Sequence, residues 1–191
     1  MTSFPWISLL TALPLVGALV LLAFGGLGKT FARCAALAFS FAAFALVIFL
    51  WLRFDTSSGG MQFQQRLTWI PTLGAEYRVG IDGLGLLMLL LTSIVVPIAI
   101  IASCRIQERV PLYYSLVLIL QTCLFGAFTA LNFFHWFIFW ELSLIPAFFP
   151  YPAMGWAAPY QRSHTISGLH HGRQRRHVAV ISRHLPRNPQ I

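Results

Sequence analysis

Long, uninterrupted apolar segments constrain this chain more than any other feature. They cover residues 4–24, 31–52, 84–102, 112–131 and 133–149. A helix of roughly 20 apolar residues crosses a hydrocarbon layer about 30 Å thick and satisfies its own backbone hydrogen bonds there. The segments lack the strict polar–apolar alternation of membrane β-strands. The sequence therefore predicts an all-α, polytopic integral membrane protein with about five transmembrane helices.

The composition excludes a soluble enzyme. Of the 191 residues, 58% are hydrophobic and only 9% are charged, whereas about 25% of the residues of a soluble domain are charged. The cysteines Cys34, Cys104 and Cys123 have no paired spacing, which excludes a disulfide scaffold and a zinc ribbon. No basic region precedes the first apolar segment, so we interpret it as a retained helix rather than a signal peptide.

The positive charge divides the chain into two parts. Residues 150–191 hold six arginines and no acidic residue, and all five acidic residues lie in residues 1–149. We predict that residues 1–149 form a membrane domain and that residues 150–191 form an unstructured basic tail. Within the membrane domain, the first and third loops hold four basic residues and the second loop holds three, which favours an N-terminus outside the cytoplasm. These residues are Lys29, Arg33, Arg105 and Arg109, against Arg53, Arg66 and Arg78.

Two glycine-rich stretches resemble nucleotide-binding loops only superficially. Residues 25–30 end in Gly-Lys-Thr but connect two apolar segments, whereas a phosphate-binding loop connects a strand to a helix. Residues 80–85 reverse the glycine spacing of the dinucleotide fingerprint. We interpret the first as a loop between helices. We interpret the second as a closely packed helix start, with Asp82 as its N-cap. The longer polar stretch 53–80 is predicted to be a loop lying against the membrane interface.

Glu141 is the candidate functional residue. It lies midway along the fifth apolar segment, between Trp140 and Leu142. A charge at that depth costs roughly 2.5–3.5 kcal/mol on insertion scales, and acidic residues inside membranes usually serve a function. Glu141 is therefore predicted to handle protons. A carboxyl group that only forms hydrogen bonds between helices is the structural alternative.

His135 and the surrounding aromatic residues give weaker signals. His135 precedes Glu141 by six residues, which is about 240° around a helix, so a direct relay within this segment is not expected. We interpret His135 as an interfacial histidine and the aromatic residues as lipid-facing or packing groups. No two histidines in residues 1–149 are spaced to bind haem or zinc, so no metal site is expected.

Two motifs resemble a known family. Residues 132–149, which include Trp-Glu-Leu-Ser-Leu-Ile-Pro at positions 140–146, resemble the fifth helix of subunit 4 (chain M) of proton-translocating NADH:quinone oxidoreductase, respiratory complex I. Residues 77–84 and 89–92 resemble the entry to that subunit's third helix. The resemblance covers residues 1–149. The string at 140–146 favours this subunit over its antiporter relatives.

The resemblance implies a function for the site. Glu141 corresponds to the helix-five glutamate of the family's proton channel, which the family pairs with a lysine on helix seven. This chain has one lysine, Lys29, and it lies in the first loop. The implied role is that of an antiporter-like subunit in redox-driven proton translocation, with other membrane subunits as partners and no nucleic acid. NADH, FMN, iron–sulfur clusters and quinone would bind to other subunits, and the isolated chain would not be catalytic. The implied location is the bacterial inner membrane.

Three alternatives stay open. The chain could be a remnant that inserts into the membrane without pumping, or a subunit of a multisubunit sodium/proton antiporter. The tail could be a genuine basic segment that binds anionic lipids or RNA phosphates. Against the last alternative, residues 154–157 can be read one base later as Trp-Gly-Gly, the continuation that the family has at this point. We therefore expect that the chain is truncated by a shift of reading frame after Phe149.

Sequencing the coding DNA through codon 149 and several hundred bases beyond tests the expected frame shift. We expect that one inserted or deleted base restores a long apolar frame containing a lysine within a membrane segment. If the frame stands as given and no apolar continuation follows, the remnant interpretation leads.

Overall fold

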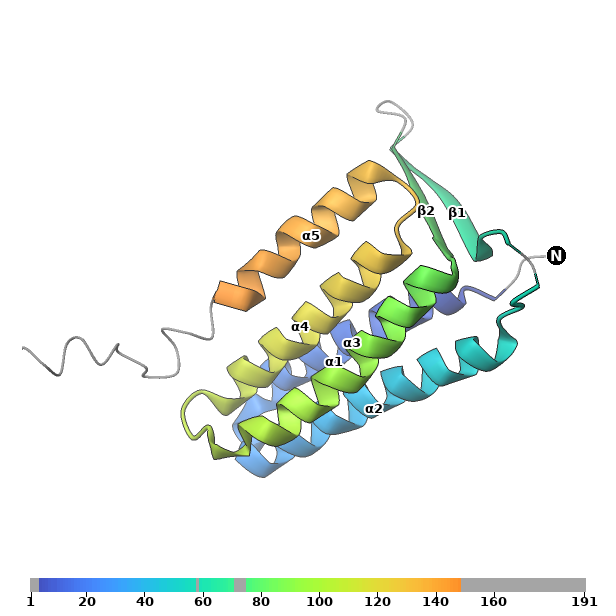
Figure 1. The fold of residues 1–191 in the computed structure, drawn as a ribbon. Helices are drawn as coiled ribbons and strands as arrows, with labels where there is room; N and C mark the ends of the chain where they lie inside the picture. The colour runs from blue at the N-terminus through green and yellow to red at the C-terminus, as the bar shows by residue number, and fades with distance from the viewer. Residues whose placement is uncertain (1–3, 58, 71–74, 149–191) are drawn as a thin grey trace, which may run out of the picture. The chain divides into compact units, whose positions relative to one another are not determined.

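The computed structural model describes residues 4–57, 59–70 and 75–148, which form a helical bundle with a β-hairpin at one end (Figure 1). The helices are α1 (Trp6–Phe24), α2 (Lys29–Arg53), α3 (Gly83–Ala102), α4 (Val110–Thr129) and α5 (Phe133–Phe148). The short 3₁₀ turns η1 (Gly25–Leu27) and η3 (Ser103–Arg105) follow α1 and α3. The predicted basic tail lies outside the described residues.

The predicted membrane architecture is confirmed. Four helices of the described part are long and apolar enough to cross a bilayer, and α5 is a shorter apolar helix. The helices α1 and α3 continue through Pro14 and Pro97, which membrane helices tolerate because neighbouring groups satisfy the freed carbonyls. Asp82 caps α3 as expected, since its Oδ1 accepts a hydrogen bond of 2.7 Å from the backbone N–H of Gly85.

The stretch 53–80, predicted to be a loop, contains a β-hairpin between α2 and α3. Strand β1 (Gln62–Ile70) pairs antiparallel with β2 (Ala75–Ile81). The signal was present, because Tyr77, Val79 and Ile81 alternate with polar residues or glycine, as in a strand with one buried face. Val79 and Ile81 are buried against the bundle. The hairpin therefore closes this end of the bundle rather than forming an irregular loop.

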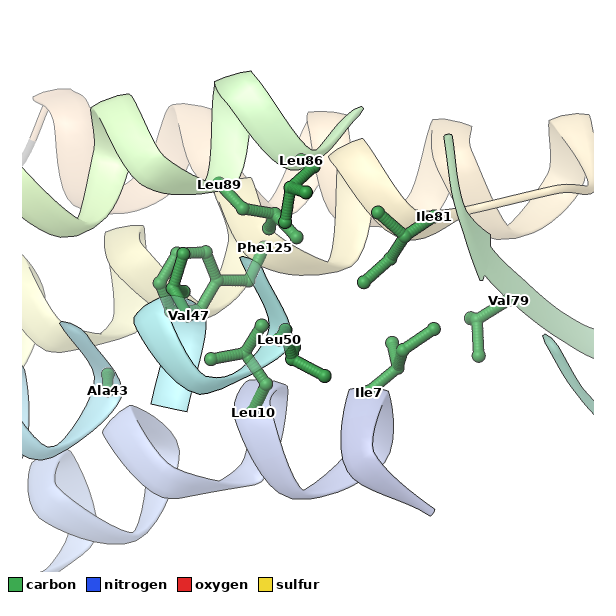
Figure 2. Packing of buried hydrophobic residues seen from close by; sticks show 10 residues of the cluster. All are labelled: Ile7, Leu10, Ala43, Val47, Leu50, Val79, Ile81, Leu86, Leu89 and Phe125. Atoms are coloured by element: carbon green, nitrogen blue, oxygen red, sulfur yellow. The ribbon is translucent and has the colours of Figure 1, made fainter. Parts of the chain in front are cut away.

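The apolar core consists of two clusters along the bundle. The cluster at the hairpin end draws on α1, α2, α3, α4 and β2 (Figure 2), and comprises Ile7, Leu10, Ala43, Val47, Leu50, Val79, Ile81, Leu86, Leu89 and Phe125. The cluster at the opposite end draws on the same four helices, and comprises Ala18, Leu21, Ala32, Ala36, Val96, Ile100, Val110, Tyr114 and Leu118. Helix α4 contributes to both clusters and packs against α1, α2, α3 and α5. It is therefore the central helix of the described fold.

The contact between α4 and α5 depends on a glycine. A Cβ atom at Gly126 would lie 2.3 Å from Cδ1 of Phe139, a separation that side-chain packing cannot accommodate without a shift. The connection between the helices is also short, because Asn132 directly precedes α5 and its Oδ1 accepts a hydrogen bond of 3.0 Å from the N–H of Phe134. Together these features hold α5 against α4.

Gly126→Ala should therefore destabilise the bundle. Overpacking costs about 1–3 kcal/mol, and because ring atoms of Phe139 would lie 2.3 and 2.5 Å from the new Cβ atom, we expect a cost in the upper part of that range. This loss would outweigh the gain of about 1 kcal/mol that alanine brings to a helix interior. Unfolding of the purified chain in detergent micelles measures the change. Gly83→Ala is the matched control, because a Cβ atom there meets nothing within 4 Å. Equal stability of Gly126→Ala and the wild type would contradict the packing.

Candidate functional site

Glu141 lies on the side of α5 that faces away from the bundle. The buried residues of α5 are His135, Ser143 and Pro146, whereas Glu141 and both of its neighbours in sequence are exposed. Glu141 is two residues from Ser143, about 200° around the helix. Its carboxyl group is therefore directed away from α4, toward the surroundings of the described bundle.

The residues flanking Glu141 extend this outer face as an apolar surface. Trp140 is 47% exposed, Leu142 45% and Ile145 53%. Glu141 lies eight positions after Phe133, the first residue of α5, which is about 12 Å along the helix. A single ionisable group thus lies within an otherwise apolar face of α5.

His135 begins the inner face of α5. Its ring centroid lies 5.0 Å from that of Tyr77 on β2, in an edge-to-face arrangement, and 4.7 Å from that of Phe139. The residue lies at the hairpin end of α5, but its side chain is buried, so the expectation of an interfacial histidine without a defined role needs refinement. His135 packs α5 against the hairpin. The structure places His135 and Glu141 on different faces, as their spacing predicts.

The aromatic residues of α5 divide between the two faces. Phe133, Trp136, Phe137 and Trp140 are exposed on the bundle surface, which suits lipid or a further helix, whereas Phe139 packs on α4. This division matches the expectation of lipid-facing and packing roles.

A small polar network ties the hairpin to α1. The hydroxyl groups of Ser8 and Tyr77 lie 3.0 Å apart, and Ser8 also bonds to the side-chain amide of Gln65 on β1. When the Gln65 amide is oriented to satisfy both of its polar atoms, its oxygen accepts hydrogen bonds from the backbone N–H groups of Trp6 (3.2 Å) and Ile7 (3.0 Å). Gln65 then caps α1 from another element, which no local sequence pattern could predict because residue and helix are far apart in the chain.

An exposed ion pair joins the two strands of the hairpin. Arg66 donates to Glu76 through two nitrogens, with N–O distances of 2.5 and 2.8 Å. The hydrogen bond from Arg66 lowers the pKa of Glu76 below its ordinary value, and the same bond raises the pKa of Arg66. Exposed pairs of this kind contribute little to stability. The pair fixes the local geometry of the hairpin and is no catalytic site.

The glycine-rich stretches have the structural roles expected of them. Residues 25–27 form a 3₁₀ turn between α1 and α2, with no strand before the Gly-Lys-Thr sequence among the described residues. A Cβ atom at Gly80 would lie 2.8 Å from Leu131, and one at Gly85 would lie 2.9 Å from the Asp82 carboxylate. Both glycines therefore allow close packing.

Lys29 does not lie beside Glu141 in the sequence or in the fold. It begins α2 in the connection from α1, and its Nζ donates a hydrogen bond of 3.2 Å to the side chain of Gln107 in the connection between α3 and α4. Nearby, Arg33 Nη2 donates a hydrogen bond of 2.9 Å to the carbonyl of Ile106. These bonds hold the two connections together.

The comparisons with known proteins agree on one group of relatives. The chain is 39% identical over 148 residues to F420H2 dehydrogenase subunit M of Methanosarcina mazei, a match covering 76% of this chain and 29% of that protein. It is 35% identical over 147 residues to NAD(P)H-quinone oxidoreductase chain 4 1 of Nostoc sp., covering 76% of this chain and 27% of the relative. The chain therefore spans less than a third of the length of these relatives. No protein-family model matches it.

Solved structures give the same fold. A chain of respiratory complex I from Thermus thermophilus with bound NADH matches with a TM-score of 0.62 and 28% identity, over 74% of this chain and 27% of that chain. A chain of the membrane-bound sulfane sulfur reductase, an archaeal respiratory membrane complex, also matches with a TM-score of 0.62, over 74% of this chain and 29% of that one. Its 20% identity supports likeness of fold alone.

The substitution Gln65→Leu tests whether Gln65 caps α1. Because the first N–H groups of a helix have no partner within the helix, losing the cap costs about 1 kcal/mol and frays the first turn of α1. Hydrogen exchange of the chain in lipid vesicles should therefore show faster exchange at the amide of Ile7, whereas Trp6 keeps its hydrogen bond of 2.8 Å to the Phe4 carbonyl. Gln64→Leu is the control, since Gln64 bonds only to the nearby Met61 carbonyl and should leave the Ile7 amide unchanged.

Proposed function

We propose that this chain, whose N-terminal three quarters belong to the family of NAD(P)H-quinone oxidoreductase chain 4 and F420H2 dehydrogenase subunit M, acts as an antiporter-like subunit in redox-driven proton translocation. Its matched part corresponds to the first helices of a longer subunit. The 191-residue chain by itself is not expected to catalyse a reaction.

The observation that carries this proposal is the position of Glu141. Its side chain is exposed on the outer face of α5, and that face is otherwise apolar. A carboxylate facing hydrocarbon at this depth would cost roughly 2.5–3.5 kcal/mol on insertion scales. A protein group beyond the described bundle that supplies a cation or a proton would offset that cost. A carboxyl group that exchanges its proton with such a partner has the chemistry that translocation requires.

The partner of Glu141 is proposed to come from protein beyond the described bundle. The chain's one lysine, Lys29, lies in the connection between α1 and α2 and bonds to Gln107. In the family that the sequence resembles, the glutamate pairs with a lysine on a later helix. That helix would adjoin the outer face of α5.

The wider assignments follow the relatives. The proposed partners are other membrane subunits of a respiratory complex, and the proposed location is the bacterial inner membrane. NADH, FMN, iron–sulfur clusters and quinone are proposed to bind to those other subunits. The electron donor is open, because one relative is named for F420H2 and others for NAD(P)H.

A sodium/proton antiporter subunit is the second candidate, because a membrane carboxyl group can serve either ion. The relatives at 33–39% identity include F420H2 dehydrogenase subunit M and chain 4 proteins of quinone oxidoreductases, which favours the oxidoreductase. A chain that inserts without pumping is the third candidate.

Glu141→Gln tests the proposed function in a full-length subunit that carries residues 1–149 of this chain and is assembled in its complex. Gln keeps the size and polarity of the side chain but cannot release a proton, so we expect proton pumping to fall to a small fraction of wild type while assembly persists. Pumping is measured by dye quenching in inverted membrane vesicles during quinone reduction, with and without sodium.

Glu108→Gln is the matched control, since Glu108 is exposed in the connection between α3 and α4. It removes the same charge outside the membrane and should leave pumping unchanged. Undiminished pumping by Glu141→Gln would refute the role of Glu141, and sodium-dependent transport would favour the antiporter. Pumping by a complex that contains only the 191-residue form would show that no later helix is needed.

A further inference from the structure

A layer of polar side chains separates the two apolar clusters of the core. On α2, Ser40 lies between Ala36 of one cluster and Ala43 of the other. On α4, Gln121 lies between Leu118 and Phe125 in the same way. Because these residues continue the buried stripes of their helices, their side chains face the interior at about the middle of the bundle.

Ser93 completes the layer from α3. It lies between Leu89 and Val96, which belong to opposite clusters, and its hydroxyl donates a hydrogen bond of 2.8 Å to the Leu90 carbonyl. Ser40, Ser93 and Gln121 all have 0% exposed surface. Three neighbouring helices thus place a polar group at one level, sealed from the surroundings of the bundle.

The hydrogen bonds of this layer are incomplete. Neither the amide nitrogen nor the amide oxygen of Gln121 has a partner, and the hydroxyl of Ser40 has none. A buried amide without partners is costly, and natural proteins satisfy such groups with protein atoms or ordered water. Gln121 and Ser40 therefore have hydrogen-bonding capacity that a small polar ligand could use.

We propose that the layer formed by Ser40, Ser93 and Gln121 binds a buried water molecule. The unpaired atoms include donors on the Gln121 nitrogen, an acceptor on its oxygen, and a hydroxyl that does both. A small ligand that both donates and accepts matches donors and acceptors of this kind. The layer contains no carboxylate to balance a metal cation, so water is the class of ligand that fits.

The prolines on α1 and α3 favour entry of the water. Pro14 and Pro97 lie inside their helices close to this level. Since proline has no N–H group, the carbonyls of Leu10 and Ser93 lose the donor that a helix normally provides. Such positions add acceptors beside the layer and let a helix bend. The packing around Gln121 must open slightly to admit the water. Bending of α1 and α3 at their prolines allows that opening.

This water site is separate from Glu141. Gly126 marks the side of α4 that contacts α5, and Gln121 lies five residues earlier, about 140° away around the helix. The proposal therefore does not depend on the proposed function of Glu141.

Solid-state NMR of the uniformly ¹⁵N-labelled full chain in lipid vesicles tests the proposal. We expect magnetisation to pass from water protons to the side-chain NH₂ of Gln121. The signal is assigned by its loss in Gln121→Met and, should that variant not fold, in Gln121→Thr, which has no side-chain NH₂ group. The exposed side chain of Gln107 serves as the reference for a group in contact with water. The backbone amides of the buried residues Leu118 and Phe125 serve as the dry references, which are groups without water contact. Transfer to Gln121 no greater than to the dry references would overturn the proposal.

Thermal unfolding provides an independent test, because a hydrated and a dry Gln121 amide predict opposite changes in the unfolding midpoint of Gln121→Met. If water satisfies the amide, Gln121→Met removes the hydrogen bonds between the amide and the water and leaves the Ser40 hydroxyl without a partner. The unfolding midpoint should then fall. If the amide is dry and unpaired, the same substitution removes a costly polar group and the midpoint should rise, which would contradict the proposal. Gln64→Met, at an exposed strand position, should leave the midpoint unchanged.

Discussion

The absence of water from the bilayer interior is the constraint on which the rest of this structure depends. Every backbone N–H and C=O group at that depth needs a partner within the protein, so the apolar segments have to be helices. Because lipid is as apolar as leucine, the helices then associate through close packing and a few polar contacts rather than through the hydrophobic effect. The contact of Gly126 with Phe139 and the cap that Gln65 places on α1 are contacts of these two kinds.

The position of α5 follows from α4 and from the hairpin. Gly126 brings α5 against the central helix, and the rings of Tyr77 and His135 fix its first turn against β2. Once the inner face of α5 is fixed at these two places, the helical repeat directs Glu141 outward. The orientation of Glu141 is thus a consequence of packing by residues that have no part in the proposed proton transfer.

The sequence predicted the features that depend on one segment at a time. Length and apolarity identified the membrane helices, and Asp82 identified the start of α3, because both signals are local. The hairpin was missed because its stretch was judged by polarity rather than by the alternation around Tyr77, Val79 and Ile81. The Gln65 cap and the layer around Gln121 depend on residues that are far apart in the chain. The outward face of Glu141 depends on which side of α5 meets α4, and helical spacing alone cannot give that.

The outer face of α5 bears on the proposal that further protein adjoins the described bundle. Trp140, Leu142 and Ile145 could face lipid at little cost, but a charged group among them would cost roughly 2.5–3.5 kcal/mol on insertion scales. The inner face of α5 supplies no partner for the Glu141 carboxyl group, because Phe139 and His135 occupy that face and it is directed away from the carboxyl group. A neighbouring protein surface with a polar or cationic group is therefore the arrangement that makes the position of Glu141 tolerable.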